Sequence, residues 1–252
     1  MSLRRNLVLS FLVGCFLLIG SASDTHSSLE PNAYCGPACS GADRCNAIGE
    51  VFESQTHLRG IQARIEIADP QLRHPDLGSN WSVMRVLTWN FCPNNPQQPC
   101  FLEVGWVKNA CFTTPGCSRY GSWKLPIRHA VFRQNPNGYV WLDISNTWPG
   151  NTNEYRVEKD DASVGWEAYV DNNLVARYWT GFSAPYSGWG GGEVVNPPYN
   201  AMGVSGILNA KYMGTDRVWR PVNDQYITES NSTIFHAVKL GPNDWQVYGC
   251  NQ

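Results

Sequence analysis

Apolar and polar residues alternate strictly from Ile61 to Ile67. A period of two is that of a β-strand with one buried face, so this segment is predicted to be a strand. The same reasoning predicts strands at Val83–Trp89, Leu102–Val107, Tyr139–Ser145, Asn153–Lys159, Gly165–Asp171, Leu174–Thr180, Gly191–Asn196, Val204–Lys211, Ile234–Leu240 and Gln246–Gly249. Turn sequences such as Asn137-Gly138 separate them, and we find no amphipathic helix of normal length. The pattern predicts an all-β fold, an antiparallel two-sheet β-sandwich of the jelly-roll or concanavalin-like kind.

The segment Tyr139–Ser145 has two faces of different composition. One face consists of Val140, Leu142 and Ile144, and the other of Tyr139, Trp141, Asp143 and Ser145. We expect the aliphatic face to be core. The aromatic and polar face has the composition of a wet binding groove rather than of a plain solvent surface.

The first 23 residues have the pattern of a signal peptide. Arg4 and Arg5 precede an apolar stretch, and small residues follow it. We therefore expect a secreted, extracellular protein, with a lipid anchor through Cys15 as the alternative, because the residues before Cys15 resemble a bacterial lipobox. Residues 24–56 look loop-like and contain cysteines, so we place the sandwich domain at 57–252. No later segment is long and apolar enough to span a bilayer.

Cysteine usage agrees with export. The chain has 9 cysteines, and an even number remains once Cys15 is set aside with the signal peptide. Cys92 could pair with Cys100, and Cys111 with Cys117, each as a local staple of a hairpin. The four others, Cys35, Cys39, Cys45 and Cys250, would then pair among themselves. A net charge of -2 with no basic block makes a nucleic-acid partner unexpected.

Glu103 lies within an apolar strand, which is an unusual place for an acid. Leu102, Val104 and Trp106 share one face by the period of two, while Glu103 and Gly105 share the other. Glycine beside the carboxylate would leave open space for the backbone of a ligand. The simpler interpretation is a glutamate on the solvent face of a strand.

Glu193 is the second unusual acid, since it follows three glycines and precedes two valines. A glycine run permits a bulge or the close approach of another chain segment. Alternatively, Glu193 is the first exposed residue after a turn. Two such acids together raise the possibility of a carboxylate pair that performs acid–base chemistry.

The stretch from about Leu58 to Cys250 resembles the neprosin domain, a family of secreted glutamic peptidases that shares a β-sandwich with the fungal eqolisins. The first family motif reads roughly I-E-A-G-W, and Leu102–Trp106 matches it. The second reads W-G-G-E-V-V, and Trp189–Val195 matches it with one extra glycine. The run from Lys159 to Trp179 resembles a family segment between these motifs in order and spacing. Cys111–Trp123 departs from the family pattern, so the resemblance supports the assignment of the acid pair more directly than it supports a particular substrate specificity.

This resemblance implies an exported acid glutamic endopeptidase that cleaves a peptide or protein substrate, preferentially after proline. Glu103 and Glu193 would share one proton. The ionised member would act as general base on a water molecule, and the protonated member would polarise the scissile carbonyl and protonate the leaving amine. The substrate groove would be lined by Tyr139, Trp141, Gly105 and Trp189. The chemistry requires no cofactor or metal, and we expect a monomer.

Two other interpretations are compatible with the same residues. Tryptophan and tyrosine on an open sheet face suit the stacking of sugar rings, so the chain could be a lectin-like carbohydrate-binding sandwich. Two glutamates about 5 to 9 Å apart could also serve a glycosidase. The third possibility is a relative that keeps the fold without catalysis, because Cys111–Trp123 differs from the family.

Overall fold

The computed structural model describes residues 44–51, 58–70, 81–109, 126–161, 165–180, 182, 187–195, 202–223, 226–229 and 235–249. In this part of the chain all regular structure is β, and every strand pairing is antiparallel. The predicted signal peptide, the cysteines other than Cys45, Cys92 and Cys100, and the segment Cys111–Trp123 lie outside the described residues.

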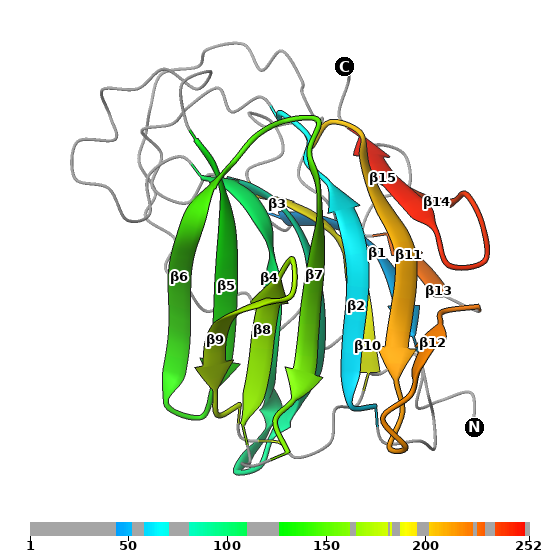
Figure 1. Ribbon diagram of the computed structural model, residues 1–252. Coiled ribbons are helices and arrows are strands. Elements are labelled where there is room, and N and C mark those ends of the chain that lie inside the picture. The colour runs from blue at the N-terminus through cyan, green and yellow to red at the C-terminus, as the bar shows by residue number, and fades with distance from the viewer. Residues whose placement is uncertain are drawn as a thin grey trace, which may run out of the picture.

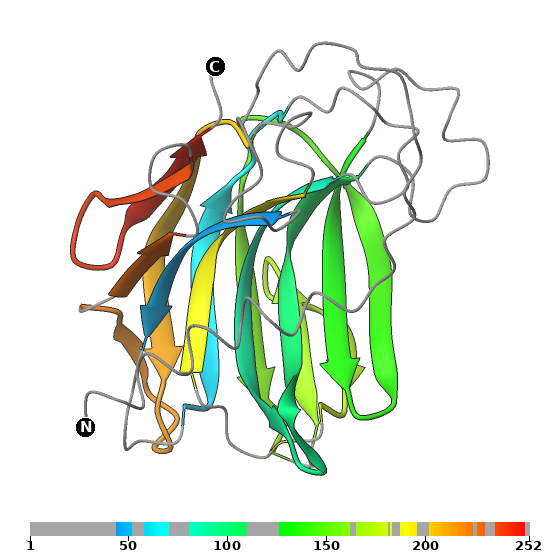
Figure 2. The same cartoon turned by 180° about the vertical axis from the view of Figure 1, so that it is seen from behind.

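Two sheets face each other (Figures 1 and 2). The seven-stranded sheet has the order β13 (Tyr226–Glu229), β1 (Arg44–Val51), β10 (Ser187–Val195), β3 (Trp81–Cys92), β4 (Asn95–Asn109), β5 (Ile127–Asn135) and β6 (Gly138–Thr147). The eight-stranded sheet has the order β14 (Phe235–Lys239), β15 (Trp245–Gly249), β11 (Ser205–Met213), β2 (Gly60–Glu66), β7 (Thr152–Lys159), β8 (Trp166–Val170) and β9 (Asn173–Tyr178), with β12 (Trp219–Pro221) paired to β11. The predicted sandwich is confirmed.

The main hydrophobic core fills the space between the sheets. Trp106, Trp166 and Trp245 are fully buried in it, together with aliphatic residues of both sheets. A smaller cluster, which includes Val83, Leu87 and Phe132, covers the other face of the seven-stranded sheet. Both faces of this sheet are therefore buried around its central strands, whereas a plain sandwich sheet would turn one face to water.

Glycines on β10 and β1 make room for Trp245. A Cβ on Gly190 would lie 3.2 Å from the indole, and one on Gly49 would lie only 2.7 Å from it. Gly188 and Gly192 have the same orientation as Gly190 on β10, because residues two apart on a strand share a face. The glycine run of the second motif thus serves the packing between the sheets.

Four strands were not predicted from the sequence: the short strands β12 and β13, and the longer strands β1 and β5. Residues 44–51 were expected to be loop-like, yet they form β1, which pairs with β10 and β13. β5 was not predicted at all. Both strands carry buried residues on both faces: Cys45 and Ala47 join one core cluster, and Ile48 joins the other. Such strands lack the alternation of apolar and polar residues on which the prediction depended.

The predicted strand Tyr139–Ser145 forms most of β6, and Tyr139, Trp141 and Asp143 share one face as expected. An irregularity in the pairing with β5 places Ser145 opposite His129, and so by register on the face of the main core. Ile144 packs against the main core. Leu142, however, is 37% exposed. The physical reason is that β6 is an edge strand of its sheet, so it has a covering neighbour on one side only.

Two polar contacts each involve a buried side chain of the seven-stranded sheet. Nδ1 of His129 lies 2.7 Å from the hydroxyl of Tyr155, which connects the two sheets. Burial lowers the pKa of His129, and the attraction of Asp171 opposes this shift only in part. The ammonium of Lys108, whose side chain is 1% exposed, donates to Oδ1 of Asp69 at 2.8 Å and to a backbone carbonyl at the same distance.

The predicted disulfide between Cys92 and Cys100 is present and closes the hairpin of β3 and β4. Cys45 is also disulfide-bonded. Structural disulfides of this kind are typical of proteins that fold in an oxidising compartment. The described part of the chain contains no helix long and apolar enough to cross a membrane.

Candidate functional site

The two glutamates lie on the same face of the seven-stranded sheet. Glu193 is on β10, Glu103 is on β4, and β3 runs between these strands. Glu193 pairs with Val83 of β3, and Glu103 pairs with Leu87 of β3. Residues that face each other across antiparallel strands point to the same side, so Arg85, halfway between Val83 and Leu87, also points to this side. Glu193, Arg85 and Glu103 therefore form a diagonal across three adjacent strands.

Arg85 contacts both carboxylates. Its Nε lies 2.8 Å from Oε2 of Glu103, and its Nη2 donates a hydrogen bond of 2.6 Å to Oε2 of Glu193. Since both nitrogens belong to one planar guanidinium with short C–N bonds, the two carboxylate oxygens are at most about 8 Å apart. The side chains of all three residues are at most 6% exposed. Acids 90 positions apart in the chain thus meet in a buried, charged cluster.

Glycines flank Arg85 on both neighbouring strands. Gly191 of β10 and Gly105 of β4 are its direct partners across the sheet. A Cβ on Gly105 would lie 1.9 Å from the carbonyl oxygen of Met84 and 2.6 Å from the Cα of Arg85. The space that we expected beside Gly105 is therefore occupied by the backbone of β3. A Cβ on Gly191 would lie 2.4 Å from the carbonyl oxygen of Ala47 on β1.

Aromatic residues surround the Glu103 end of the cluster. Phe132 pairs with Glu103 across the strands, and its ring meets that of Trp141 at 4.2 Å, edge to face. Phe101 makes a similar contact with Tyr139 at 6.4 Å. Tyr139 is 47% exposed. An exposed aromatic ring thus lies on the same face as the two buried acids.

The outcome for the other expected site residues is mixed. Trp141 is half-buried, and its indole N–H donates to Asp143 at 2.7 Å. Trp189 lies by backbone register in the row of Leu87 and Glu103, but its side chain is outside the described part. Arg85 was missed from the sequence. The signal for it was present, because Arg85 is a charged residue inside the apolar strand Val83–Leu87, which is the same feature that singled out Glu103.

The electrostatics of Arg85 follow from its surroundings. Burial by itself lowers the pKa of Arg85, but the attraction of Glu103 and Glu193 outweighs burial and raises the pKa above its ordinary value, with a smaller contribution from Tyr139. The guanidinium is therefore a permanent positive charge. A cation this close favours the ionised form of a carboxyl group.

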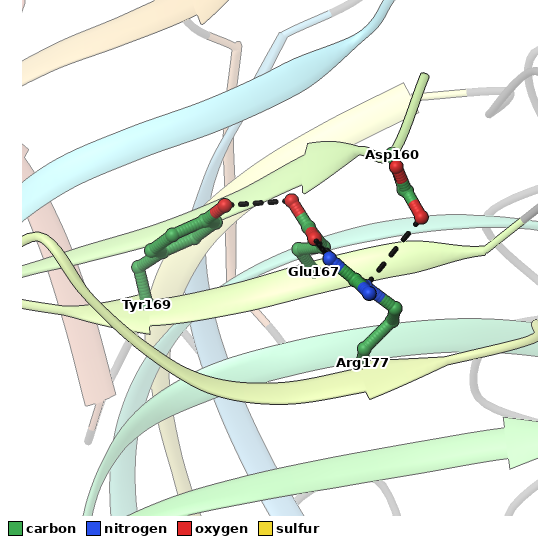
Figure 3. A network of polar contacts seen from close by, with 4 residues as sticks. All are labelled: Asp160, Glu167, Tyr169 and Arg177. Carbon is green, nitrogen blue, oxygen red and sulfur yellow. Dashed lines mark hydrogen bonds and ion pairs between the residues drawn. The ribbon is translucent and has the colours of Figure 1, made fainter. Parts of the chain in front are cut away.

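A second polar network lies on the other sheet (Figure 3). Glu167 accepts hydrogen bonds from the hydroxyl of Tyr169 at 2.6 Å and from Nε of Arg177 at 2.8 Å, and Arg177 also pairs with Asp160. Ala168, between Glu167 and Tyr169, belongs to the core, so this network is on the outer face of the eight-stranded sheet. The core separates it from Arg85. Among the described residues, no three His, Cys, Asp or Glu side chains are grouped to hold a metal ion.

Comparisons with known proteins define the fold and no closer relationship. No protein-family model and no curated protein sequence matches the chain. The crystal structure of Scytalido-glutamic peptidase with a peptide-based transition state analog matches with a TM-score of 0.52 and 10% identity, over 81% of this chain and 98% of the peptidase. An alginate lyase from Alteromonas sp. 272 matches with a TM-score of 0.35 and 10% identity, over 61% of this chain and 59% of the lyase. The chain therefore shares its β-sandwich fold with a glutamic peptidase.

Proposed function

We propose that the chain is an acid glutamic endopeptidase whose catalytic residues are Glu103 and Glu193. The observation that carries this proposal is the convergence of both carboxylates on Arg85, on one sheet face, from strands that are far apart in sequence. The fold shared with a glutamic peptidase supports it, as does the resemblance of both motifs to the neprosin family. The proposal includes secretion, which the disulfide supports.

The proposed reaction uses one proton between the two acids. The ionised glutamate removes a proton from a water molecule, which attacks the scissile carbonyl carbon. The protonated glutamate donates a hydrogen bond to the carbonyl oxygen and later supplies the proton to the leaving amine. At neutral pH both acids would be ionised beside Arg85 and no acid would be available, so activity is expected at acidic pH.

The aromatic residues next to Glu103 supply the proposed binding surface for substrate. Tyr139 and Trp141 would pack against an apolar side chain, or against a proline ring, next to the cleaved bond. A preference for cleavage after proline is part of the proposal and rests on the family resemblance. A series of peptides that differ only in having Pro, Leu or Ala at one position tests this preference separately from activity.

The test of the main proposal is hydrolysis of an unfolded protein such as casein at pH 3–5 by the purified full chain. Glu193→Gln removes one of the two carboxyl groups of the pair, so the rate should fall by about 10² to 10⁴. Glu103→Gln removes the other carboxyl group and should lower the rate over the same range. Glu154→Gln is a matched control, since Glu154 binds Gln62 on the other sheet. Wild-type rates in both site variants would remove the proposal.

A glycosidase is the second candidate. Two observations favour it: the limit of about 8 Å between the carboxylate oxygens includes the separations used by glycosidases, and Tyr139 presents an exposed ring on the same face. Reducing-sugar release from a panel of polysaccharides would identify this activity. If the same panel is bound without hydrolysis, the chain is a carbohydrate-binding protein.

A further inference from the structure

We propose that Arg85 is the positioning residue of the Glu103–Glu193 pair, and that its guanidinium makes the form with one shared proton the electrically neutral form of the site. The catalytic consequence rests on the proposed function. The electrostatic part concerns only the three side chains and can be measured without any activity.

The architecture of the sheet directs Arg85 toward both acids at once. β3 is the central strand of seven, and the glutamates project from the strands on either side of it. The two cross-strand partners of Arg85 are Gly191 and Gly105, which have no side chains to block lateral contact. The guanidinium reaches Glu193 in one diagonal direction and Glu103 in the other. A planar group with donors on several nitrogens suits this double contact, whereas a lysine ammonium does not.

The count of charges in this cluster decides which protonation state is favoured. Arginine does not lose its proton in proteins. With both glutamates ionised the cluster carries one net negative charge, with one proton it carries none, and with two protons it carries one net positive charge. A net charge that is almost fully removed from water is unfavourable. The form with one proton, which is the form that peptide hydrolysis needs, is thereby stabilised over a wide range of pH.

Removal of Arg85 changes this count. Without the guanidinium, the neutral cluster has both glutamates protonated, and the form with one proton carries a negative charge. The form with one proton then becomes dominant only at higher pH. A single opposite charge at hydrogen-bond distance shifts a carboxyl pKa by about 1–3 units. Arg85 therefore keeps the working range of the pair acidic.

Among the charged side chains that the structure describes on this face, the others are too distant or already paired to do the same. The described strands contribute Glu50, Arg128, Asp143 and Tyr139; Arg44 of β1 also lies on this face by backbone register, two positions from the partner of Glu193, but its side chain is outside the described part. Arg128 pairs with Asp143 at 3.1 Å. Glu50 is on β1, four positions from the cross-strand partner of Glu193 and three strands away from Glu103, so its Cα is about 13 Å or more from both. Tyr139 is uncharged at acidic pH.

The test compares the pH dependence of kcat/KM for the wild type, Arg85→Gln, Arg85→Lys and Arg128→Gln. We expect the profile of Arg85→Gln to move upward by about 1–3 pH units. Arg85→Lys retains the charge and should stay near the wild-type profile with a lower maximum. Arg128→Gln, the matched control, removes a positive charge from the same face without touching the glutamates and should not move the profile. A profile of Arg85→Gln that coincides with that of the wild type would overturn the inference.

Carboxyl ¹³C NMR of the full chain separates this inference from the proposed function. In the wild type, we expect the pair to titrate in two steps, one below and one above the ordinary glutamate value of about 4.3, with Glu103→Gln and Glu193→Gln used for assignment. Two steps together at about 4.3 would refute the inference, whether or not Arg85→Gln folds. If the steps are separated in the wild type and move upward in Arg85→Gln, but no peptide is hydrolysed, the role of Arg85 stands and the peptidase proposal fails.

Discussion

Gly105→Ala tests the close approach of β3 and β4 on which the site depends. The added Cβ would lie 1.9 Å from the carbonyl oxygen of Met84 and 2.6 Å from the Cα of Arg85. Both are backbone atoms in the middle of a sheet, so neither can move aside by a rotamer change. The two strands must separate to accept the methyl group.

The expected loss of stability follows from two opposing effects. Overpacking of a well-packed region costs about 1–3 kcal/mol and sometimes more, and contact with backbone places this substitution at the upper end. The reduced freedom of the unfolded chain offsets about 0.4–1 kcal/mol. We expect the free energy of unfolding to fall by about 2–4 kcal/mol. Separation of the strands also moves Arg85 away from Glu103, so hydrolysis should decrease as well.

Urea denaturation followed by tryptophan fluorescence measures this change, with the slope of the transition compared between variants. Gly241→Ala is the control, because its Cβ would meet no atom closer than 3.5 Å. A Gly105→Ala protein with the wild-type midpoint and slope would refute the argument that these strands need glycine at this position.

Two further substitutions test buried polar contacts. Burial lowers the pKa of His129 in the folded protein, so the unfolded chain binds the proton first as the pH falls below about 6.5, and the free energy of unfolding decreases there. Glutamine at position 129 cannot titrate, so the urea midpoint of His129→Gln should fall less between pH 7.5 and 5 than that of the wild type. An equal fall would contradict this assignment. Asp69→Asn leaves the Lys108 ammonium without a counter-charge and should cost about 1–3 kcal/mol, below the 3–5 kcal/mol of a fully buried pair because Asp69 is 53% exposed. Asp216→Asn, which breaks an exposed pair with Arg220, should leave the midpoint almost unchanged in the same urea assay, and an equal loss in both variants would show that Lys108 does not depend on Asp69.

Strands with one buried face were predictable from their alternation, whereas of the strands with two buried faces β3 and β4 were predicted and β1 and β5 were not. β2 shows the alternation that the period of two demands, and the structure places it as expected. In β5, by contrast, Ala130, Val131 and Phe132 are consecutive buried residues, because Val131 faces the main core and its neighbours face the second cluster. No alternation survives in such a strand. Only a run of apolar residues remains, which is a weaker signal.

The two acids of the site could be identified from the sequence, but their meeting could not be derived from it. Glu103 is unusual in an apolar strand, and so is Arg85, by the same criterion. Their contact with Glu193 depends on the strand order β10-β3-β4, in which β10 pairs with a strand about a hundred residues earlier. Local patterns carry no information about such long-range pairing, so Arg85 had no predicted partner.

The central position of β10, β3 and β4 in their sheet should make these strands resist local unfolding. Each of these strands is hydrogen-bonded along both sides, while β13 and β6 are bonded along one side only. Amide protons of strands in the middle of a sheet exchange with deuterium only when a large part of the protein unfolds transiently, which is rare. Edge strands unfold locally and more often. The three strands that carry Glu193, Arg85 and Glu103 should therefore be the last to exchange, and the cluster should stay assembled under conditions that already loosen the rim of the sheet.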